Sequence, residues 1–261
     1  MTDETLKYLF ALAPADIVEW YKQKGLAFSW DWRDVWQDAH ARSFTAAKVM
    51  KLDILQELKD EVDKIFSEGI TFEQFQQDLK PALKKLGWWG KVKAKDVPGY
   101  KPAPDIDPEK VVQLGSPARL KIIFNTNSRV AYSAARYKSK AQNIKNRPYW
   151  RYNQLDRRTK RKVHAVYAGK VFMWDDPIWD KIYPPSDWNC GCSVTALSHA
   201  EFEAAGGKLS YGKDFPIVTG KGWDYNPGKS YYKPDQKKYD NDIFIQYKMA
   251  GGEVKGSPHA Q

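Results

Sequence analysis

Apolar residues recur at helical spacing along the first part of the chain, and this repeat constrains the fold more than any other feature. In residues 53–66 and again in 72–86 they return every three or four positions. Such spacing puts them on one face of each helix, where they can be buried together. The sequence therefore predicts a helical region over residues 1–90, with two antiparallel helices at its centre.

The residue types at the ends of these helices support the same interpretation. Asp53 is expected to cap the first helix. Thr71 and Gln74 have the spacing of a capping box, in which each side chain accepts a hydrogen bond from the backbone of the other residue. Pro81 lies inside the second pattern and is expected to kink or split that helix.

The chain changes character after these helices. Residues 91–115 are rich in Gly and Pro and predict a linker or a crossing arm. Ser116 and Pro117 are the residue types favoured at the start of a helix. The helix that follows is expected to pause at residues 125–127 and to resume as a basic, alanine-rich helix.

Three segments beyond this helix predict strands: residues 149–155, 169–174 and 192–198. The predicted fold class is therefore α+β, with a helical N-terminal region followed by a compact domain that has a small β-sheet and a basic helix. We place this domain at residues 116–200. Residues 201–261 are rich in Gly, Tyr and Lys and predict an extended C-terminal arm.

Positive charge is concentrated in residues 119–170, which hold fifteen Lys or Arg against one acid, while the rest of the chain has 27 basic and 31 acidic residues. Such a segment suits phosphate or an acidic protein surface. A solvated basic face with no fixed partner is the alternative. The residues expected to contact nucleic acid or an acidic protein surface are Arg129, Arg136, Lys138, Lys140, Arg157, Arg158, Arg161 and Lys162.

The only two cysteines, Cys190 and Cys192, are separated by one residue. A disulfide between them would be strained, and thioredoxin-like centres have two intervening residues, so a redox role is disfavoured. If the second and third predicted strands are neighbours, the loop between them brings both cysteines over His164. Zinc usually takes four ligands, and Asp156, Asp187, His199 or water could supply the fourth. Spacing alone favours the alternative of two core side chains and a hydrogen-bonded histidine.

Several other classes of protein are disfavoured by the sequence. No apolar run of signal-peptide type follows the N-terminus and no stretch of eighteen apolar residues occurs, so we expect a soluble protein made in the cytosol that does not contact a membrane. Glycine loops that cradle phosphate do not occur. A nucleophilic pair of cysteine and His164 would lack a distinctive third group to orient the histidine.

An ordered series of motifs is more informative than any single site. GWWG, LGSPARLKIIFNTNSRVAYSAARY, DRRTKRKVHAVYAGKVFMWDDPIWD, YPPSDWNCGCSV and GWDYNPG follow one another along the chain. This series resembles the phage Mu F-like family of minor head proteins, from about residue 28 to residue 228. The matching positions are Arg129, Tyr132, Arg136, Asp156, Arg158, Thr159, His164, Gly169, Asp176, Pro177, Trp179, Pro184, Pro185, Asn189, Cys190 and Cys192.

The resemblance implies a structural, non-enzymatic minor capsid protein of a tailed phage or prophage, acting in head assembly and genome delivery. Its implied partners are the portal protein, other head proteins and double-stranded DNA bound without sequence preference. Its implied location is the virion, in the head interior or at the portal, and the host cytoplasm during assembly. Some members also carry a C-terminal toxin or nuclease domain, which we do not expect in a chain ending at Gln261.

The resemblance also bears on the cysteines. Many members have a second pair of cysteines in place of the His164 region, a pattern similar to a structural zinc site, which favours zinc held by His164, Cys190, Cys192 and Asp156. Members usually have arginine where this chain has Gly191. Two alternatives remain for the whole protein: a metal-dependent nuclease or nucleotide-modifying enzyme, and a free-standing DNA-binding protein.

Overall fold

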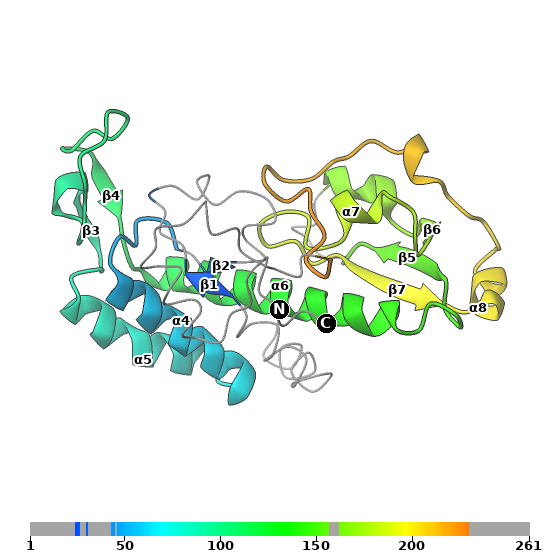
Figure 1. Ribbon diagram of the computed structural model, residues 1–261, viewed down its shortest axis with the longest axis horizontal. Coiled ribbons are helices and arrows are strands. Elements are labelled where there is room, and N and C mark those ends of the chain that lie inside the picture. The colour runs from blue at the N-terminus through cyan, green and yellow to red at the C-terminus, as the bar shows by residue number, and fades with distance from the viewer. Residues whose placement is uncertain (1–23, 27–29, 31–42, 45, 157–161, 230–261) are drawn as a thin grey trace, which may run out of the picture. The chain divides into compact units, whose positions relative to one another are not determined.

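The computed structural model describes residues 24–26, 30, 43–44, 46–156 and 162–229 (Figure 1). The chain divides into two compact units, which we call the helical unit (residues 1–128 and 231–261) and the sheet unit (residues 129–230). The division falls inside helix α6 (Pro117–Ala141), whereas the predicted linker lies before that helix. Helices and small sheets occur together, which confirms the predicted α+β class.

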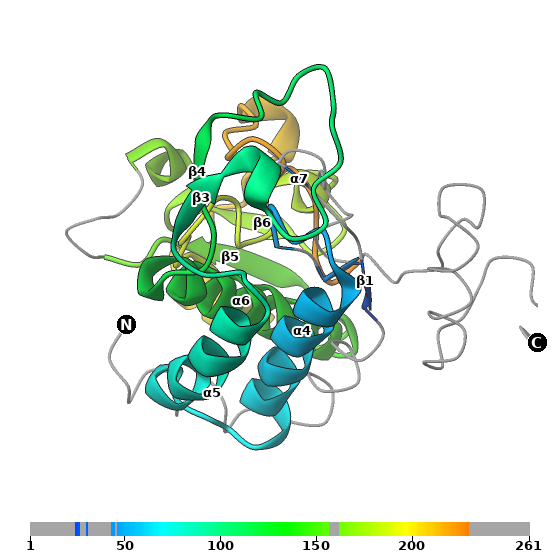
Figure 2. The same ribbon diagram turned by 90° about the vertical axis from the view of Figure 1, so that its left-hand side faces the viewer.

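Two helices form the main part of the helical unit, α4 (Leu52–Ser67) and α5 (Phe72–Lys85). They lie side by side in both views (Figures 1 and 2), joined by a short turn. The Phe75 ring packs edge-on against Phe124 of α6, with 5.3 Å between ring centroids. Most side chains expected from the apolar spacing are buried: Ile54, Leu55, Leu58, Val62, Ile65, Phe66, Phe75, Leu79 and Leu83. Phe72 and Leu86 are half-buried, and the charged residue Glu61 is also buried.

The predicted caps differ in outcome. Thr71 and Gln74 form the expected capping box, with the Thr71 hydroxyl accepting from the Gln74 amide at 3.3 Å and the Gln74 side chain accepting from the Thr71 amide at 2.9 Å. The prediction for Asp53 was wrong, because α4 begins one residue earlier and Lys51 occupies the cap position without a side-chain bond. Asp53 lies instead in the first turn, where its negative charge interacts favourably with the positive end of the helix dipole.

Neither predicted interruption splits its helix. Pro81 lies inside the unbroken helix α5. The carbonyl group that loses its partner there is on the exposed side of the helix, where water can satisfy it. α6 continues through residues 125–127, since Asn127 and Ser128 bond back to the carbonyl groups of Ile123 and Phe124, at 2.9 and 2.8 Å.

The remaining strands of the helical unit are short. β1 (Gly25–Leu26) and β2 (Ser43–Phe44) pair in parallel. The predicted linker contains an antiparallel ribbon of β3 (Lys91–Lys93) and β4 (Val111–Gln113), with the 3-10 helix η1 (Ala94–Asp96) after β3.

The sheet unit is built on three antiparallel strands: β5 (Tyr149–Asn153), β6 (Val171–Met173) and β7 (Ser193–Leu197). β5 lies at the centre and pairs with both of the others. The expectation that the second and third predicted strands are neighbours was therefore wrong. The loop between them crosses the central strand, and it still returns to the region of His164.

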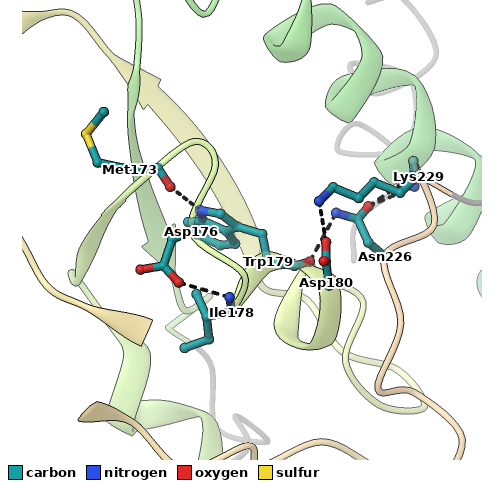
Figure 3. A network of polar contacts seen from close by, with 8 residues as sticks. Met173, Asp176, Ile178, Trp179, Asp180, Asn226 and Lys229 are labelled. Atoms are coloured by element: carbon teal, nitrogen blue, oxygen red, sulfur yellow. Dashed lines mark hydrogen bonds and ion pairs between the residues drawn. The ribbon is translucent and has the colours of Figure 1, made fainter. Parts of the chain in front are cut away.

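The core of the sheet unit is mainly aromatic. The buried residues Trp150 and Tyr152 alternate with half-buried residues along β5, so both side chains point to the same face of the sheet. The short helix α7 (Trp179–Ile182) contributes to the core on this face, and the Trp179 indole donates to the Met173 carbonyl at 2.9 Å (Figure 3). The cluster consists of Trp150, Tyr152, Tyr167, Phe172, Ile178, Trp179, Ile182, Tyr183 and Val194.

The prediction of an extended arm over residues 201–261 was wrong in part. The segment after β7 forms α8 (His199–Ala204) and the 3-10 helix η3 (Gly212–Asp214), and then runs to residue 229 as part of the sheet unit. The buried amide of Asn226 donates to the Trp179 carbonyl at 3.0 Å, and Lys229 pairs with Asp180 beside it (Figure 3). These contacts hold the described part of the segment on α7.

Candidate metal centre

His164 reaches the interior of the sheet unit on the 3-10 helix η2 (Lys162–Tyr167). Gly169 follows with φ of +73°, a left-handed conformation that favours glycine. The Gly169 amide then donates to the Tyr152 carbonyl and the Tyr152 amide donates to the Lys170 carbonyl, both at 2.9 Å. This return to β5 fixes His164 beside the central strand.

The two cysteines lie where the loop turns into β7. Asn189 adopts φ of +57°, which asparagine tolerates better than most residues, and the Cys190 amide donates to the Asp187 carbonyl at 3.0 Å. The resulting turn directs both cysteine side chains toward His164. The left-handed backbone conformation at position 189 therefore explains why asparagine precedes the cysteines.

Helix α6 holds this loop from the other side. Arg129 donates to the Cys190 carbonyl at 3.4 Å, and the Ser133 hydroxyl donates to the Pro184 carbonyl. Lys140 donates to the Tyr183 hydroxyl at 3.5 Å. Three side chains of the basic helix thus bind the cysteine loop. Two of them, Arg129 and Lys140, were assigned to external partners from charge alone and have a structural use here.

Three potential metal ligands meet in the interior. The Nδ1 atom of His164 lies 3.7 Å from the Sγ atoms of both Cys190 and Cys192. In a tetrahedral zinc site with Zn–S bonds of about 2.3 Å and Zn–N bonds of about 2.0–2.1 Å, nitrogen and sulfur ligands stand about 3.6 Å apart. His164 is fully buried, Cys190 is 3% exposed, and Cys192 is half-buried. Donor types and spacing both fit zinc.

The thiols influence each other strongly. Hydrogen bonding with Cys192, and then with His164, lowers the pKa of Cys190 against the opposing effect of burial. The interaction with Cys190, and then burial, raises the pKa of Cys192. Ionisation of one thiol thus opposes ionisation of the other, and a bound divalent cation would stabilise two adjacent thiolates.

The other predicted ligands lie elsewhere. Asp156 is exposed and does not belong to the group of three, whose ligand atoms lie within 4.8 Å of one another. His199 is exposed at the start of α8, where its Nδ1 atom is 3.3 Å from the Tyr149 hydroxyl. Within the described ranges, the site thus offers three protein ligands of the usual zinc types.

Sequence reasoning missed two polar side chains beside the sulfur atoms. Tyr152 and Ser186 are both fully buried, and the Ser186 hydroxyl donates to the Ile182 carbonyl at 2.8 Å. Burial, followed by the nearby Cys192 and Cys190, raises the pKa of Tyr152. The strand pattern of β5 could have identified Tyr152 as an inward-facing polar residue, but its proximity to the cysteines depends on how the loop returns.

The predicted contact residues for nucleic acid or a portal protein are only partly described. Lys138 and Lys162 are exposed, and Arg136 is half-buried. Lys140 is also half-buried, and burial followed by nearby Arg136 lowers its pKa to about 8. Arg157, Arg158 and Arg161 lie outside the described residues.

Charge differs sharply between the two units. The sheet unit contains eighteen Lys or Arg and nine Asp or Glu, a formal net charge of +9, which leaves +1 for the rest of the chain. None of the helices in the described ranges is long and apolar enough to span a membrane.

Comparison with known proteins gives consistent matches. The chain is 38% identical to "Putative capsid assembly protein F" of Escherichia phage Mu over 262 residues, which cover 88% of this chain and 58% of the relative. It is 40% identical to the "Mu-like prophage FluMu F protein" of Haemophilus influenzae over 182 residues, covering 70% of this chain and 41% of the relative. The chain thus matches about half the length of these relatives. No solved structure matches.

The matching region includes both units and the candidate metal centre. Residues 56–195 match the family described as Phage Mu protein F like protein, which is more than half of the chain. This range contains α5, α6, His164 and both cysteines. The chain belongs to the Phage Mu protein F like family.

Proposed function

We propose that this protein is a structural component of the head of a tailed phage or prophage and acts in head assembly. The observation that carries this proposal is the 38% identity, over 88% of the chain, to a phage Mu protein whose name describes capsid assembly. Other head proteins are the proposed partners. The portal protein is the partner we expect to be contacted directly, and the assembled head or host cytoplasm is the proposed location.

We further propose that His164, Cys190 and Cys192 hold zinc as a structural ion. Zinc bound there would join η2 to the cysteine turn, and its ligands His164 and Cys190 are 26 residues apart in the sequence. Three protein ligands would also suit a catalytic zinc, which keeps an open position for water or substrate. Burial of His164 and Cys190 favours the structural role, because a catalytic ion must be reached by its substrate.

The net charge of +9 on the sheet unit supports a third part of the proposal, contact with packaged DNA through the phosphate backbone. Lys138 and Lys162 are the exposed, described lysines in the basic segment that would take part. Such contact is electrostatic and carries no sequence preference.

Gene deletion tests the proposed role in head assembly. Removing the gene from its phage or prophage should abolish DNA-filled heads after induction, and supplying the wild-type chain should restore them. Normal yields of filled heads without the gene would overturn the proposal. Restoration by the Cys190→Ser variant at wild-type efficiency would leave head assembly supported and would argue against a required metal.

Binding to short duplexes tests the contact with DNA. Fluorescence anisotropy between 50 and 200 mM salt should show weakening by about tenfold or more if several phosphates are contacted. A variant carrying Lys138→Gln and Lys162→Gln should bind more weakly and with a shallower salt dependence. Lys84→Gln, at an exposed position of the helical unit, is the matched control. Equal binding by all three proteins would contradict the assignment of the sheet unit.

Metal analysis tests the zinc. Purified protein should contain one zinc per chain, and chelation should lower the melting temperature. Protein that lacks zinc and does not bind added zinc would return the two cysteines to the role of ordinary core residues.

A further inference from the structure

Tyr152 carries a buried hydroxyl group that has no evident structural purpose. The residue is fully buried on the central strand β5, and its hydroxyl oxygen completes no hydrogen bond with the described part of the chain. An unpaired buried donor costs stability, so such a group usually has a partner in the working state of the protein. Tyr167 stands beside it with a ring-centroid distance of 5.3 Å, and in contrast its hydroxyl donates to Pro216 and accepts from Val218.

The groups around the Tyr152 hydroxyl point to the missing partner. Tyr152 pairs with Val194 in the β5–β7 register, which places it across from the residues that follow Cys192. Cys192, Cys190 and Ser186 are its polar neighbours. The Ser186 hydroxyl already donates to the Ile182 carbonyl, so its oxygen is a neutral acceptor, which metal binding does not ionise. The sulfur atoms are therefore the neighbours whose strength as hydrogen-bond acceptors depends on their state, either thiol or metal-bound thiolate.

Metal binding would change that state. A thiol is a weak acceptor, but a metal-bound cysteine is a thiolate, and hydrogen bonds to an ionised acceptor are stronger than neutral ones. Groups that donate to metal ligands tune the metal, and removing them typically weakens metal binding by about 10–100-fold.

We propose that the Tyr152 hydroxyl donates a hydrogen bond to the metal-bound thiolate of Cys192. Tyr152 is thus a positioning residue for the metal and not a ligand. This inference rests on the proposed zinc site. It explains why a phenol, and not the phenylalanine that a purely apolar core would accept, lies at this position of β5.

The test compares Tyr152→Phe with the matched control Tyr167→Phe. Both variants remove one hydroxyl from a fully buried tyrosine of the same core and keep the ring. Zinc affinity is measured by competition with a chromophoric chelator, and cobalt-substituted protein reports the sulfur-to-metal charge-transfer bands. We expect Tyr152→Phe to bind zinc about 10–100-fold more weakly and to shift these bands. Tyr167→Phe should leave both unchanged, although it loses two hydrogen bonds.

A measurement on the wild-type chain does not depend on the folding of a variant. In protein loaded with cadmium-113, the Tyr152 hydroxyl proton should exchange slowly with water and show scalar coupling to the metal through the sulfur atom. A rapidly exchanging, uncoupled hydroxyl would overturn the inference while leaving the metal centre intact, as would equal zinc affinity and equal cobalt spectra for wild type and Tyr152→Phe. A wild-type chain that binds none of these metals would overturn both proposals.

Discussion

The two units of this protein are stabilised in different ways. In the helical unit, α4 and α5 bury mainly aliphatic side chains that recur at helical spacing. In the sheet unit, three strands of three to five residues support long connections, and the core consists of aromatic residues with polar atoms and a group of His and Cys side chains. Regular helices can thus be stabilised by burying their own apolar faces, whereas long loops need further contacts that hold them in place.

The difference predicts that the units respond to different perturbations. Burial of apolar area should dominate the helical unit, with a contribution of about 25 cal/mol per Å². In the sheet unit, a large share of the stability should depend on the ligands that tie η2 to the cysteine turn. The following experiments test this comparison, from the largest expected effect to the smallest.

Removal of the proposed metal ligands should have the largest effect. We expect Cys190→Ser, or chelation of the wild type, to destabilise the sheet unit by on the order of 5 kcal/mol, because metal-binding free energy contributes directly to folding. Hydrogen exchange measured by mass spectrometry should then show lost protection in β5 and β7 and unchanged protection in α4 and α5. Thr195→Ser, at an exposed position of β7, is the control. Equal loss of protection in both units would contradict the comparison.

Truncation of the aliphatic core should have the next largest effect, on the other unit. Leu58 is fully buried on α4, so Leu58→Ala should destabilise the helical unit by about 2–5 kcal/mol through lost burial and a residual cavity. Ile122→Ala removes apolar atoms from a residue that is 45% exposed and should cost far less. Chemical denaturation gives the stability, and zinc stoichiometry should stay unchanged in both variants. Loss of zinc in Leu58→Ala would show that the units are not independent.

Removal of the α5 cap should have a moderate effect. Thr71→Ala deletes the oxygen that accepts from the Gln74 amide and should cost about 1 kcal/mol of stability in the helical unit. Thr71→Ser keeps that oxygen and is the matched control. The two variants should differ in urea denaturation and in amide exchange at the first turn of α5, and identical behaviour would mean that the cap does not limit stability.

The smallest effect should be a change in pH dependence through Glu61 of α4. Its side chain is 6% exposed, and burial is the main cause that raises its pKa above the usual value of 4.5, while Lys64 opposes the shift and Asp78 reinforces it. The folded state therefore binds this proton more tightly than the unfolded state. The associated stability is present below pH 4.5 and is lost as the pH rises through the raised value.

Glu61→Gln cannot titrate, so the stability difference between wild type and this variant should change across that pH range. Denaturant titrations at several pH values measure this difference, in which the contributions of other carboxylates cancel. Asp53→Asn is the control, at an exposed position of the same helix. A difference that does not vary with pH would show that Glu61 has the same pKa in the folded and unfolded states.

The regular elements were more predictable than their connections. The apolar spacing identified α4 and α5, and the Thr71 capping box followed from local sequence because both partners lie within one helical turn. The order of the strands could not be obtained in this way. The side-chain pattern of a strand shows which face is buried, but it does not show which of the other two strands pairs with each edge.

The candidate centre was predicted in part. His164, Cys190 and Cys192 were identified as a group, and their ligand atoms do lie together. Asp156 was proposed from its residue type, but its exposed position outside the group depends on the path of the chain after β5. Tyr152 was missed because tyrosine is an ordinary strand residue, and only the returning loop gives its hydroxyl polar neighbours.

The sequence by itself determined the helical unit's buried face, the concentration of positive charge and the family to which the chain belongs. These properties depend on residues close together in the chain or on matching residues one by one. Only the tertiary structure decided that β5 lies between β6 and β7, that α6 bonds to the cysteine loop, and that Tyr152 pairs with Val194, two residues after Cys192. Those contacts join segments tens of residues apart, and their formation depends on how loops close around a shared aromatic core.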